Sequence, residues 1–355
     1  MILVCTLMSI LADLTPSLAA RCDLQPAQVS AAATALVETH ETDDAKIAFL
    51  DALARKGETP AEVAGFADTY RKRAINPGVE AWAAQAIDFV GTGGDHAGGF
   101  NISSLVTLVL ASAGVTVMKH GNGGITSKCG SADLLAALGL DLHASPEKSR
   151  RALTDLGYCF FFAPAYHTVF KVMVPVRQVL AARGQRTVFN VLGPLINPGR
   201  PARTVMGVYS PHLIPRLAGA LTELGNEAGL VAHGTIEGDR GIDEMTTTTV
   251  NHVQGVGRLR DIATTWTAAD FGLNASPFTD LIGGDVATNV ALTEAILAGR
   301  GPAGLVDTIV LNAATGLWIS GRVADIRAGL APARELLLGG AVRRKVSDTR
   351  EFYRS

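Results

Sequence analysis

The sequence has few charged residues, few aromatic residues and almost no charge imbalance. Charged residues make up 18% of the 355 positions and the formal net charge is −2, which argues against a broad nucleic-acid-binding surface. Hydrophobic residues make up 48%, so a large core is expected and wholesale disorder is not. The length allows two domains, or one large domain with a smaller companion.

Cysteine is also scarce, and its positions do not suggest a disulfide framework or a metal centre. Cys5, Cys22, Cys129 and Cys159 form neither a CxxC pair nor a metal-ligand spacing. Reduced thiols are the simplest interpretation, and we expect a cytoplasmic protein.

Long hydrophobic runs are missing as well. No stretch reaches the ~18 uninterrupted apolar residues of a transmembrane helix, so we expect no membrane association. The apolar start lacks a positively charged beginning and is interrupted at Asp13. We therefore interpret it as an amphipathic first helix rather than a signal peptide, with either Met1 or Met8 as the start.

The first part of the chain predicts helices that pack on one another. Alanine and leucine recur at three- and four-residue spacing in VSAAATALVETH, AKIAFLDALARKG and PAEVAGFADTYRKRA. Gly57 fits a helix stop, and Thr59 followed by Pro60 fits the start of the next helix. We predict a small all-helical domain over residues 1–85, to which the apolar helical segment 165–185 returns.

From residue 86 onward, short apolar runs rich in β-branched or aromatic residues replace this pattern. They are AIDFV, VTVMKHG, CFFFAPA, TVMGVYS, AGLVAHG and TIVLNAA, and helix-like stretches such as SADLLAALG alternate with many of them. This alternation predicts an α/β fold, with a larger domain built on a mostly parallel central sheet. The domain would comprise residues 86–164 and 186–355.

Two glycine-rich loops in this domain each follow an apolar run and precede a helix. In the first, Gly91–Asp95 is followed by Asn101–Ser104, which can cap the next helix; the second runs over Lys119–Gly124. Their free backbone N–H groups suit a ligand with several phosphates. Lys119 can neutralise phosphate charge, and the Ser103 hydroxyl can bind phosphate or Mg²⁺. A tight turn with an ordinary cap would explain the first loop alone.

Several motifs follow one another in an order that resembles one enzyme family. GTGGD, FNIS, KHGN, GSAD, FFFAPAYH, PVR, RTVFNVLGPLINP and HG…GIDE resemble segments of the anthranilate phosphoribosyltransferase family, and with KGETPAEVAGF the resemblance covers nearly the whole chain. It implies a nucleoside phosphorylase/phosphoribosyltransferase-like homodimer that requires Mg²⁺. The reaction implied is transfer of the phosphoribosyl group from phosphoribosyl pyrophosphate (PRPP) to the amine of anthranilate, in tryptophan biosynthesis.

The resemblance also implies which residues bind each substrate. Arg177 would bind the anthranilate carboxylate and His167 would line the substrate path, with Gly91 and Asn122 beside them. The metal would be held by Ser103, Asp243 and Glu244. The residues implied for PRPP are Gly91, Gly94, Asp95, Gly99, Asn101, Ile102, Ser103, Ser104, Lys119, His120, Gly121, Asn122, Gly123, Gly124, Ile125, Thr126, Ser127 and Ser131.

Elementary chemistry supports these roles less specifically. A guanidinium forms planar, bidentate bonds with a carboxylate, and Mg²⁺ prefers hard oxygen ligands. From the sequence alone, however, Arg177 could equally be a surface arginine, and Asp243-Glu244 a solvated acidic pair. No protein nucleophile is expected, because anthranilate itself supplies the attacking amine and positioning would provide most of the catalysis.

The chain departs from the family pattern at several positions. Gly99 stands where the family usually has threonine, and Gly123 where it usually has arginine, so the pyrophosphate loops lose a hydroxyl and a positive charge. The spacings 177–186 and 233–243 are longer than usual, and Tyr166 replaces a histidine of some members.

These departures leave two alternatives. One is a non-catalytic, nucleic-acid-binding paralogue of the same fold, and the other is a related nucleoside phosphorylase. Retention of Arg177 and of the Asp243-Glu244 pair argues against the paralogue, as does the net charge of −2. A phosphorylase has no evident need of the FNIS and GIDE motifs. We therefore expect PRPP and anthranilate as partners, and no nucleic acid.

Overall fold

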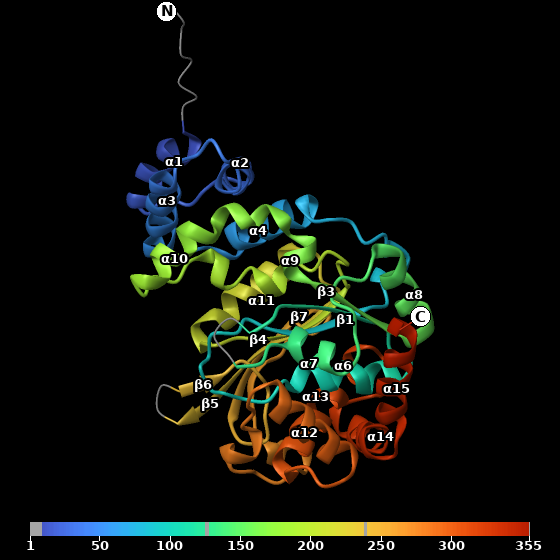
Figure 1. The fold of residues 1–355 in the computed structure, drawn as a ribbon. Coiled ribbons are helices and arrows are strands. Elements are labelled where there is room, and N and C mark those ends of the chain that lie inside the picture. The colour runs from blue at the N-terminus through green and yellow to red at the C-terminus, as the bar shows by residue number, and fades with distance from the viewer. Residues whose placement is uncertain (1–8, 125–127, 238–239, 355) are drawn as a thin grey trace, which may run out of the picture.

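The computed structural model describes residues 9–124, 128–237 and 240–354. The chain begins with helices that pack on one another, as the sequence predicts (Figure 1). Leu11, Phe49 and Phe66 lie in their core, which also takes up Met173 and Val176 from a later segment. These helices are α1 (Ile10–Ala19), α2 (Pro26–Leu36), α3 (Asp43–Lys56), α4 (Pro60–Arg73) and the short α5 (Glu80–Ala83).

The predicted boundary between α3 and α4 is confirmed. Gly57 follows α3 with a φ of +86°, a conformation that favours glycine, and Thr59 caps α4 in a reciprocal capping box with Glu62. Helix α10 (Val174–Ala182), which lies in the segment 165–185, contacts α3. The exact division into domains stays a prediction.

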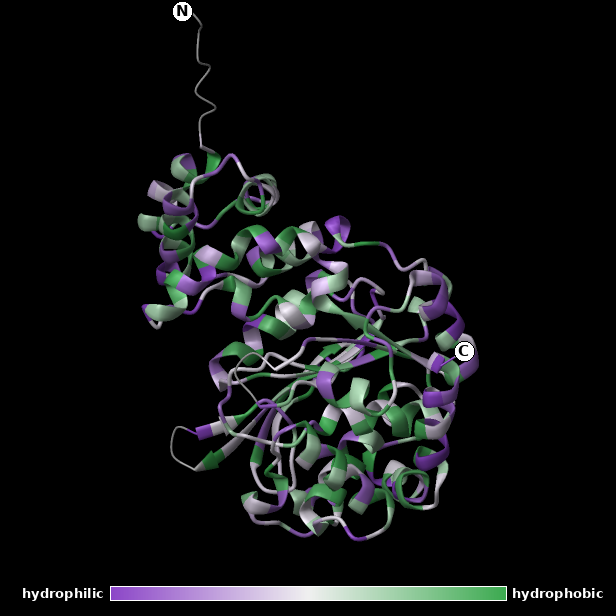
Figure 2. Ribbon diagram, in the orientation of Figure 1, coloured by the Kyte–Doolittle hydropathy of each residue, from purple (hydrophilic) through white to green (hydrophobic). Residues whose placement is uncertain are grey.

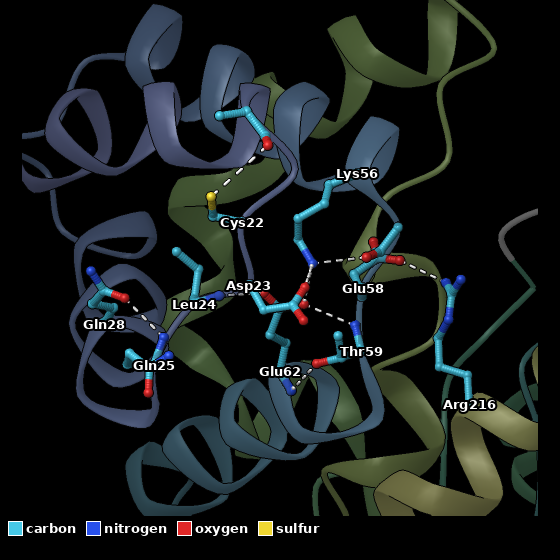
Figure 3. A network of polar contacts seen from close by, with 12 residues as sticks. Cys22, Asp23, Leu24, Gln25, Gln28, Lys56, Glu58, Thr59, Glu62 and Arg216 are labelled. Atoms are coloured by element: carbon cyan, nitrogen blue, oxygen red, sulfur yellow. Dashed lines mark hydrogen bonds and ion pairs between the residues drawn. The ribbon is translucent and has the colours of Figure 1, made fainter.

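A polar network lies within the helical part, and a neighbouring ion pair joins that part to the rest of the molecule (Figure 3). The Lys56 ammonium lies 2.7 Å from a carboxylate oxygen of Asp23 and 2.8 Å from one of Glu62. Glu58 forms a 2.7 Å ion pair with Arg216 of α11 (Ile214–Glu223), which packs on α4. Since Glu58 is largely buried, this pair ties the entry of α4 to the α/β part.

The described residues form an eight-stranded sheet in the order β3-β2-β1-β4-β5-β7-β8, with β6 paired to β5. The first five strands are parallel, which confirms the predicted mostly parallel sheet; β6, β7 and β8, which the sequence did not indicate, add antiparallel pairs. The strands are β1 (Ile87–Gly91), β2 (Val117–Gly121), β3 (Tyr158–Phe162), β4 (Arg203–Gly207), β5 (Ala228–Glu237), β6 (Arg240–Ile242), β7 (Val250–Gly257) and β8 (Ala263–Trp266).

Helices cover both faces of the sheet. Helix α6 packs against β1, β2 and β3, while α11 packs against β5 and β7 on the side of the helical part (Figure 1). Figure 2 shows hydrophobic residues along the strands and hydrophilic residues on the outer helix at the C-terminus. The remaining α-helices are α6 (Ile102–Ser112), α7 (Ser131–Ala137), α8 (Pro146–Leu156), α9 (Ala163–Tyr166), α12 (Val286–Leu297), α13 (Ala303–Ile319), α14 (Ile326–Leu338) and α15 (Ala341–Arg354).

Short 3₁₀ helices connect several of these elements. They are η1 (Thr168–Met173), η2 (Val188–Asn190), η3 (Gly193–Leu195), η4 (Pro211–Leu213), η5 (Ala268–Phe271) and η6 (Phe278–Leu281). No helix in the described part of the chain is both long and apolar enough to cross a membrane.

One predicted strand is wrong. The run TIVLNAA lies inside α13, which packs on α6 and α14 and is buried on nearly every side. A helix surrounded by protein has apolar residues all round and therefore loses the 3.6-residue period that identifies amphipathic helices. A short apolar run of this kind cannot be told from a buried strand by periodicity.

Candidate functional site

The first glycine-rich loop leaves β1 and enters α6 at the carboxyl edge of the parallel strands. Gly93 and Gly94 have φ values of +66° and +75°, which glycine adopts without strain. Asn101 occupies the N-cap position, but its side chain does not cap the helix. Its amide donates to the Cys129 carbonyl at 3.0 Å and accepts from Asn289 at 2.9 Å. Asn101 therefore connects this loop to the end of the second loop.

The acidic pair Asp243-Glu244 follows β6 and lies directly on the ends of β1 and β4. The Asp243 carboxylate accepts a 2.7 Å hydrogen bond from the Gly93 N–H. A β-carbon on Gly91 would lie 2.3 Å from Oδ2 of Asp243, and one on Gly207 would lie 1.6 Å from its carbonyl oxygen. Glycine at both strand ends is thus what lets the pair approach the first loop.

The electrostatics of this pair favour a bound cation. Burial raises the pKa of Asp243 well above its usual value, and the nearby Asp95 and Glu244 raise it further. Burial also raises the pKa of Glu244 to about 7, although Lys119 opposes that shift. A divalent cation would relieve the cost of ionising these carboxyl groups. Mg²⁺ typically takes one or two carboxylates and completes its shell with phosphates and water, so this donor set fits it.

The described residues hold no preformed cluster of three or more histidine, cysteine, aspartate or glutamate side chains suited to a metal. Ser103 is the additional oxygen donor that the sequence indicates, and it lies in the first turn of α6. The attraction of its backbone N–H for the Glu244 carboxylate lowers the pKa of that group somewhat. Ser103 and Glu244 are therefore neighbours.

Lys119 on β2 is fully buried beneath these groups. Its ammonium donates to the Phe89 carbonyl at 2.6 Å and to the Ser103 hydroxyl at 3.1 Å. Burial lowers its pKa, whereas the negative charges of Asp88 and Glu244 oppose that change. The structure thus brings Lys119, Ser103 and the acidic pair together at one end of the sheet.

The second loop is shaped by a residue that the sequence analysis did not select. Asp133 in the first turn of α7 accepts hydrogen bonds from the N–H groups of Gly124 (2.7 Å) and Gly130 (2.8 Å). Asn122 accepts from the N–H of Gly123 at 2.8 Å. The position of Asp133 in the GSAD motif, at the start of a helix, was the available signal. Ile125, Thr126 and Ser127, which were predicted to bind PRPP, lie outside the described residues.

Two buried histidines lie beside this loop, with their rings 5.2 Å apart. Nδ1 of His120 lies 3.1 Å from the Gly193 carbonyl, but its Nε2 and both ring nitrogens of His167 have no hydrogen-bond partner in the described part of the chain. Burial lowers the pKa of His167 to about 4, against a weaker opposing effect of the Ile196 carbonyl, so the ring is neutral at pH 7. The neutral His167 ring and the Nε2 of His120 can therefore serve a polar ligand.

An aromatic series leads from the histidines to α10. The His167 ring stacks on Phe170 at 5.6 Å, and Phe170 meets Phe189 edge-on at 5.6 Å. The Arg177 guanidinium lies 5.9 Å from the Phe189 ring centre. Arg177 is exposed and, among the described residues, has no carboxylate ion-pair partner. A series of aromatic rings that ends at a guanidinium with no carboxylate partner in the described residues suits an aromatic acid.

Sequence reasoning missed two further residues around the loops. Arg186 donates to the Gly94 carbonyl at 2.9 Å, and its guanidinium lies 3.7 Å from the centre of the Tyr209 ring. Asp88 of β1 accepts from the His120 N–H at 3.3 Å and from the Asn197 amide at 2.8 Å. A charged residue within the apolar strand AIDFV was a signal for Asp88, and the place of Arg186 at the start of the motif RTVFNVLGPLINP was a signal for Arg186.

The structure shows what surrounds the positions that depart from the family pattern. A β-carbon on Gly99 would lie 3.2 Å from Ile242, and one on Gly123 would lie 3.1 Å from a carboxylate oxygen of Asp133. The Tyr166 hydroxyl lies 3.4 Å from the Ser149 hydroxyl in the core, so this residue fills a structural position. The segment 233–243, which is longer than usual in the family, contains the end of β5 and the strand β6 that pairs with it.

Known proteins resemble this chain over almost its whole length. The model of the glycosyl transferase family, a/b domain, matches residues 83–343. An anthranilate phosphoribosyltransferase of Deinococcus radiodurans is 43% identical over 293 residues, which is 82% of this chain and 84% of that protein. One from a Synechococcus strain is 39% identical over 336 residues, covering 93% and 95%.

Solved structures agree with this likeness. The crystal structure of anthranilate phosphoribosyltransferase from Thermus thermophilus has a TM-score of 0.87 and 36% identity, and the match covers 97% of this chain and 100% of that one. The Saccharomyces cerevisiae enzyme in complex with PRPP and Mg has a TM-score of 0.83 over 98% of both chains. Its identity is 23%, so this second likeness concerns the fold.

Proposed function

The chain belongs to the anthranilate phosphoribosyltransferase family, and we propose that its two glycine-rich loops and the Asp243-Glu244 pair form the site of reaction. The protein transfers the phosphoribosyl group of PRPP to anthranilate, giving N-(5-phosphoribosyl)anthranilate and pyrophosphate in tryptophan biosynthesis. The observation that carries the site assignment is the contact of the half-buried Asp243 and Glu244 with the first loop, beside Lys119.

PRPP binds across the two loops. The positive end of the α6 dipole attracts phosphate oxygens, and the Gly94 N–H is a donor for them, whereas the N–H groups of Gly93, Gly123 and Gly124 already donate within the protein. Lys119 contributes positive charge close to Ser103, at the end where the loops meet. These donors stabilise negative charge on the leaving pyrophosphate, and that charge is largest in the transition state.

Mg²⁺ is held by Asp243, Glu244 and the Ser103 hydroxyl. The support is a half-buried carboxylate pair whose raised pKa values make it costly to ionise without a cation, and a yeast relative of the same fold is described in complex with PRPP and Mg. Bound there with PRPP, the metal supplies positive charge to the pyrophosphate oxygens. The protein residues keep those oxygens and the ribose in register with the acceptor.

Anthranilate binds along the aromatic series, with its carboxylate on Arg177. His167 lines its path as a neutral ring, and Asn122 and Gly91 border the acceptor where the two loops meet. The yeast relative is also described in complex with 4-fluoroanthranilate. The aromatic amine is largely unprotonated at neutral pH, so these residues need to orient it rather than activate it.

The decisive assay follows the loss of anthranilate fluorescence in the presence of PRPP and Mg²⁺. We expect turnover that depends on all three components. Folded protein that gives no turnover would contradict the proposal and would favour the non-catalytic paralogue. Nucleic-acid binding at physiological salt would then be tested, although the net charge of −2 argues against it.

The assembly and location of the protein complete the proposal. We place it in the cytoplasm as a homodimer, without nucleic-acid or membrane partners. The family resemblance and the absence of paired cysteine motifs from the sequence support this placement. Light scattering coupled to size-exclusion chromatography measures the mass directly, and a monomeric mass at micromolar concentration would contradict the dimer.

A further inference from the structure

The segment that follows the acidic pair is buried among polar side chains. Met245 and Thr246–Thr249 connect Glu244 to β7, and Thr246 and Thr247 are at most 2% exposed. Four successive threonines are an unusual choice for a buried connection, because each hydroxyl there must find a partner. Here the partners come largely from elsewhere in the chain.

Helix α13 supplies one set of these partners. The Asn312 amide donates to the Met245 carbonyl at 2.7 Å. The Thr308 hydroxyl, one helical turn earlier, accepts from the N–H of Thr247 at 3.2 Å and lies 3.0 Å from the Thr247 hydroxyl. Both helix side chains are at most 1% exposed, so water does not compete for these contacts. They are the polar members of the run TIVLNAA.

Asn251 at the start of β7 holds the segment from the other side. Its amide donates to the Thr246 carbonyl at 2.9 Å, and its side-chain oxygen accepts from the Thr246 N–H at 2.8 Å. The backbone immediately after Glu244 is therefore fixed by α13 and by β7 together. A shift of that backbone would carry the Glu244 and Asp243 carboxylates with it.

We propose that Thr308 and Asn312 are positioning residues that fix Met245 and Thr247 and thereby hold the Asp243 and Glu244 carboxylates in place for Mg²⁺. This inference rests on the proposed function of the acidic pair. Mg²⁺ demands nearly ideal octahedral geometry, so small displacements of its ligands weaken binding. Groups that orient metal ligands typically change metal affinity by 10–100-fold when removed.

The test compares near-isosteric substitutions on one face of α13 with a matched control on the same helix. Thr308→Val and Asn312→Leu remove the contacts to the segment. Thr315→Val is the control, since the Thr315 hydroxyl is equally buried but bonds only to Leu311 of its own helix in the described part of the chain. Thr308→Ser keeps the hydroxyl and tests for recovery.

Two quantities are measured for each protein. The first is the Mg²⁺ concentration that gives half-maximal turnover at saturating PRPP and anthranilate. The second, which needs no turnover, is the rise in melting temperature when Mg²⁺ and PRPP are added without anthranilate. We expect Thr308→Val and Asn312→Leu to need about tenfold more Mg²⁺ and to show a smaller rise in melting temperature. Thr308→Ser should recover most of the lost affinity.

Equal Mg²⁺ requirements in Thr308→Val and Thr315→Val would overturn the inference, and Thr308→Val decides the question if Asn312→Leu does not fold. A rise in the anthranilate KM with an unchanged Mg²⁺ requirement would also overturn it. A wild-type protein that turns over without any Mg²⁺ would instead contradict the proposed metal role itself. The two failures are therefore distinguishable.

Discussion

The N–H of Gly93 donates a 2.7 Å hydrogen bond to the carboxylate of Asp243, 150 positions further along the chain. This bond makes the first glycine-rich loop and the acidic pair one structural unit. The bond also holds the Asp243 carboxylate close to Gly91 and Gly207, the last residues of β1 and β4, where a β-carbon has no room. Changes at the supporting glycines should therefore affect the metal site before they affect the rest of the fold.

Gly207→Ala should disable the metal site. The added β-carbon would lie 1.6 Å from the Asp243 carbonyl oxygen, a backbone atom that can move only with its whole segment. We expect the Mg²⁺ concentration for half-maximal turnover to rise by at least about tenfold. Gly225→Ala is the control, because a β-carbon there would meet no atom within 4 Å, although the φ of Gly225 is +78°. This substitution should lower the free energy of unfolding by about 1 kcal/mol and leave the Mg²⁺ requirement unchanged. A normal Mg²⁺ requirement in Gly207→Ala would refute this prediction.

Arg177→Ala should raise the anthranilate KM while leaving PRPP binding nearly intact. A charged hydrogen bond to a carboxylate contributes about 1.5–3 kcal/mol, so the expected rise is roughly 10- to 150-fold. Arg183→Ala, an exposed arginine just after the same helix, is the matched control and should change neither constant. Steady-state kinetics with each substrate varied in turn measures both. An unchanged anthranilate KM would remove Arg177 from the acceptor site.

His167 should make the protein less stable in mild acid. Burial lowers its folded-state pKa to about 4, below the value of about 6.5 in the unfolded chain. The unfolded state therefore binds more protons, and the contribution to stability is complete above pH 6.5 and is lost as the pH falls toward 4.

Urea unfolding of wild type and His167→Gln at pH 7 and pH 5 measures this contribution. Wild type should lose roughly 2 kcal/mol more than the variant between these two pH values. The His120 ring, which faces His167, has its pKa lowered in the same direction, whereas burial raises the pKa of Asp88 to about 6 and opposes the trend in both proteins. If wild type and His167→Gln lose the same unfolding free energy between pH 7 and pH 5, the folded-state pKa of His167 is not lowered.

Gly123→Arg should strengthen PRPP binding. Gly123 does not adopt a positive φ, and the nearest obstacle to a β-carbon is the Asp133 carboxylate at 3.1 Å, which must move by a few tenths of an ångström. An arginine there would restore a positive charge at the rim of the loop, and we expect a severalfold lower KM for PRPP. Gly123→Ala isolates the effect of the β-carbon alone. If both variants bind PRPP equally well, the charge has no role.

The sequence allowed the parallel sheet and the leading helices to be predicted because their signals are local. Thr59 and Gly57 mark helix ends by capping and by a positive φ, which depend on neighbouring residues. TIVLNAA was misread because burial on all sides erases helical periodicity. What separates a strand from a buried helix there is the packing of α13 on α6, and that is tertiary information.

In the candidate site, too, local motifs could be predicted from the sequence and contacts between distant residues could not. The glycine loops and the acidic pair were recognisable as motifs, although their roles stay predictions. The meeting of Lys119 with Ser103 could be expected from strands that end at one edge of a sheet. Arg186 begins a quoted motif, but its contact with Gly94, 92 positions away, could not be predicted. Asn312 could not be selected, because its partner Met245 lies 67 positions away.

The order of strands in the sheet has a consequence for how the protein matures. Strand β1 pairs with β2 on one side and with β4, a much later strand in the sequence, on the other. Asp243, which accepts the hydrogen bond of the Gly93 N–H, follows β4 in the sequence. On a ribosome, the first loop emerges long before the residues that complete it. Contacts this distant in sequence slow folding, because the intervening loop must close first. A chain truncated before residue 243 would therefore carry both glycine loops and still lack an assembled metal site.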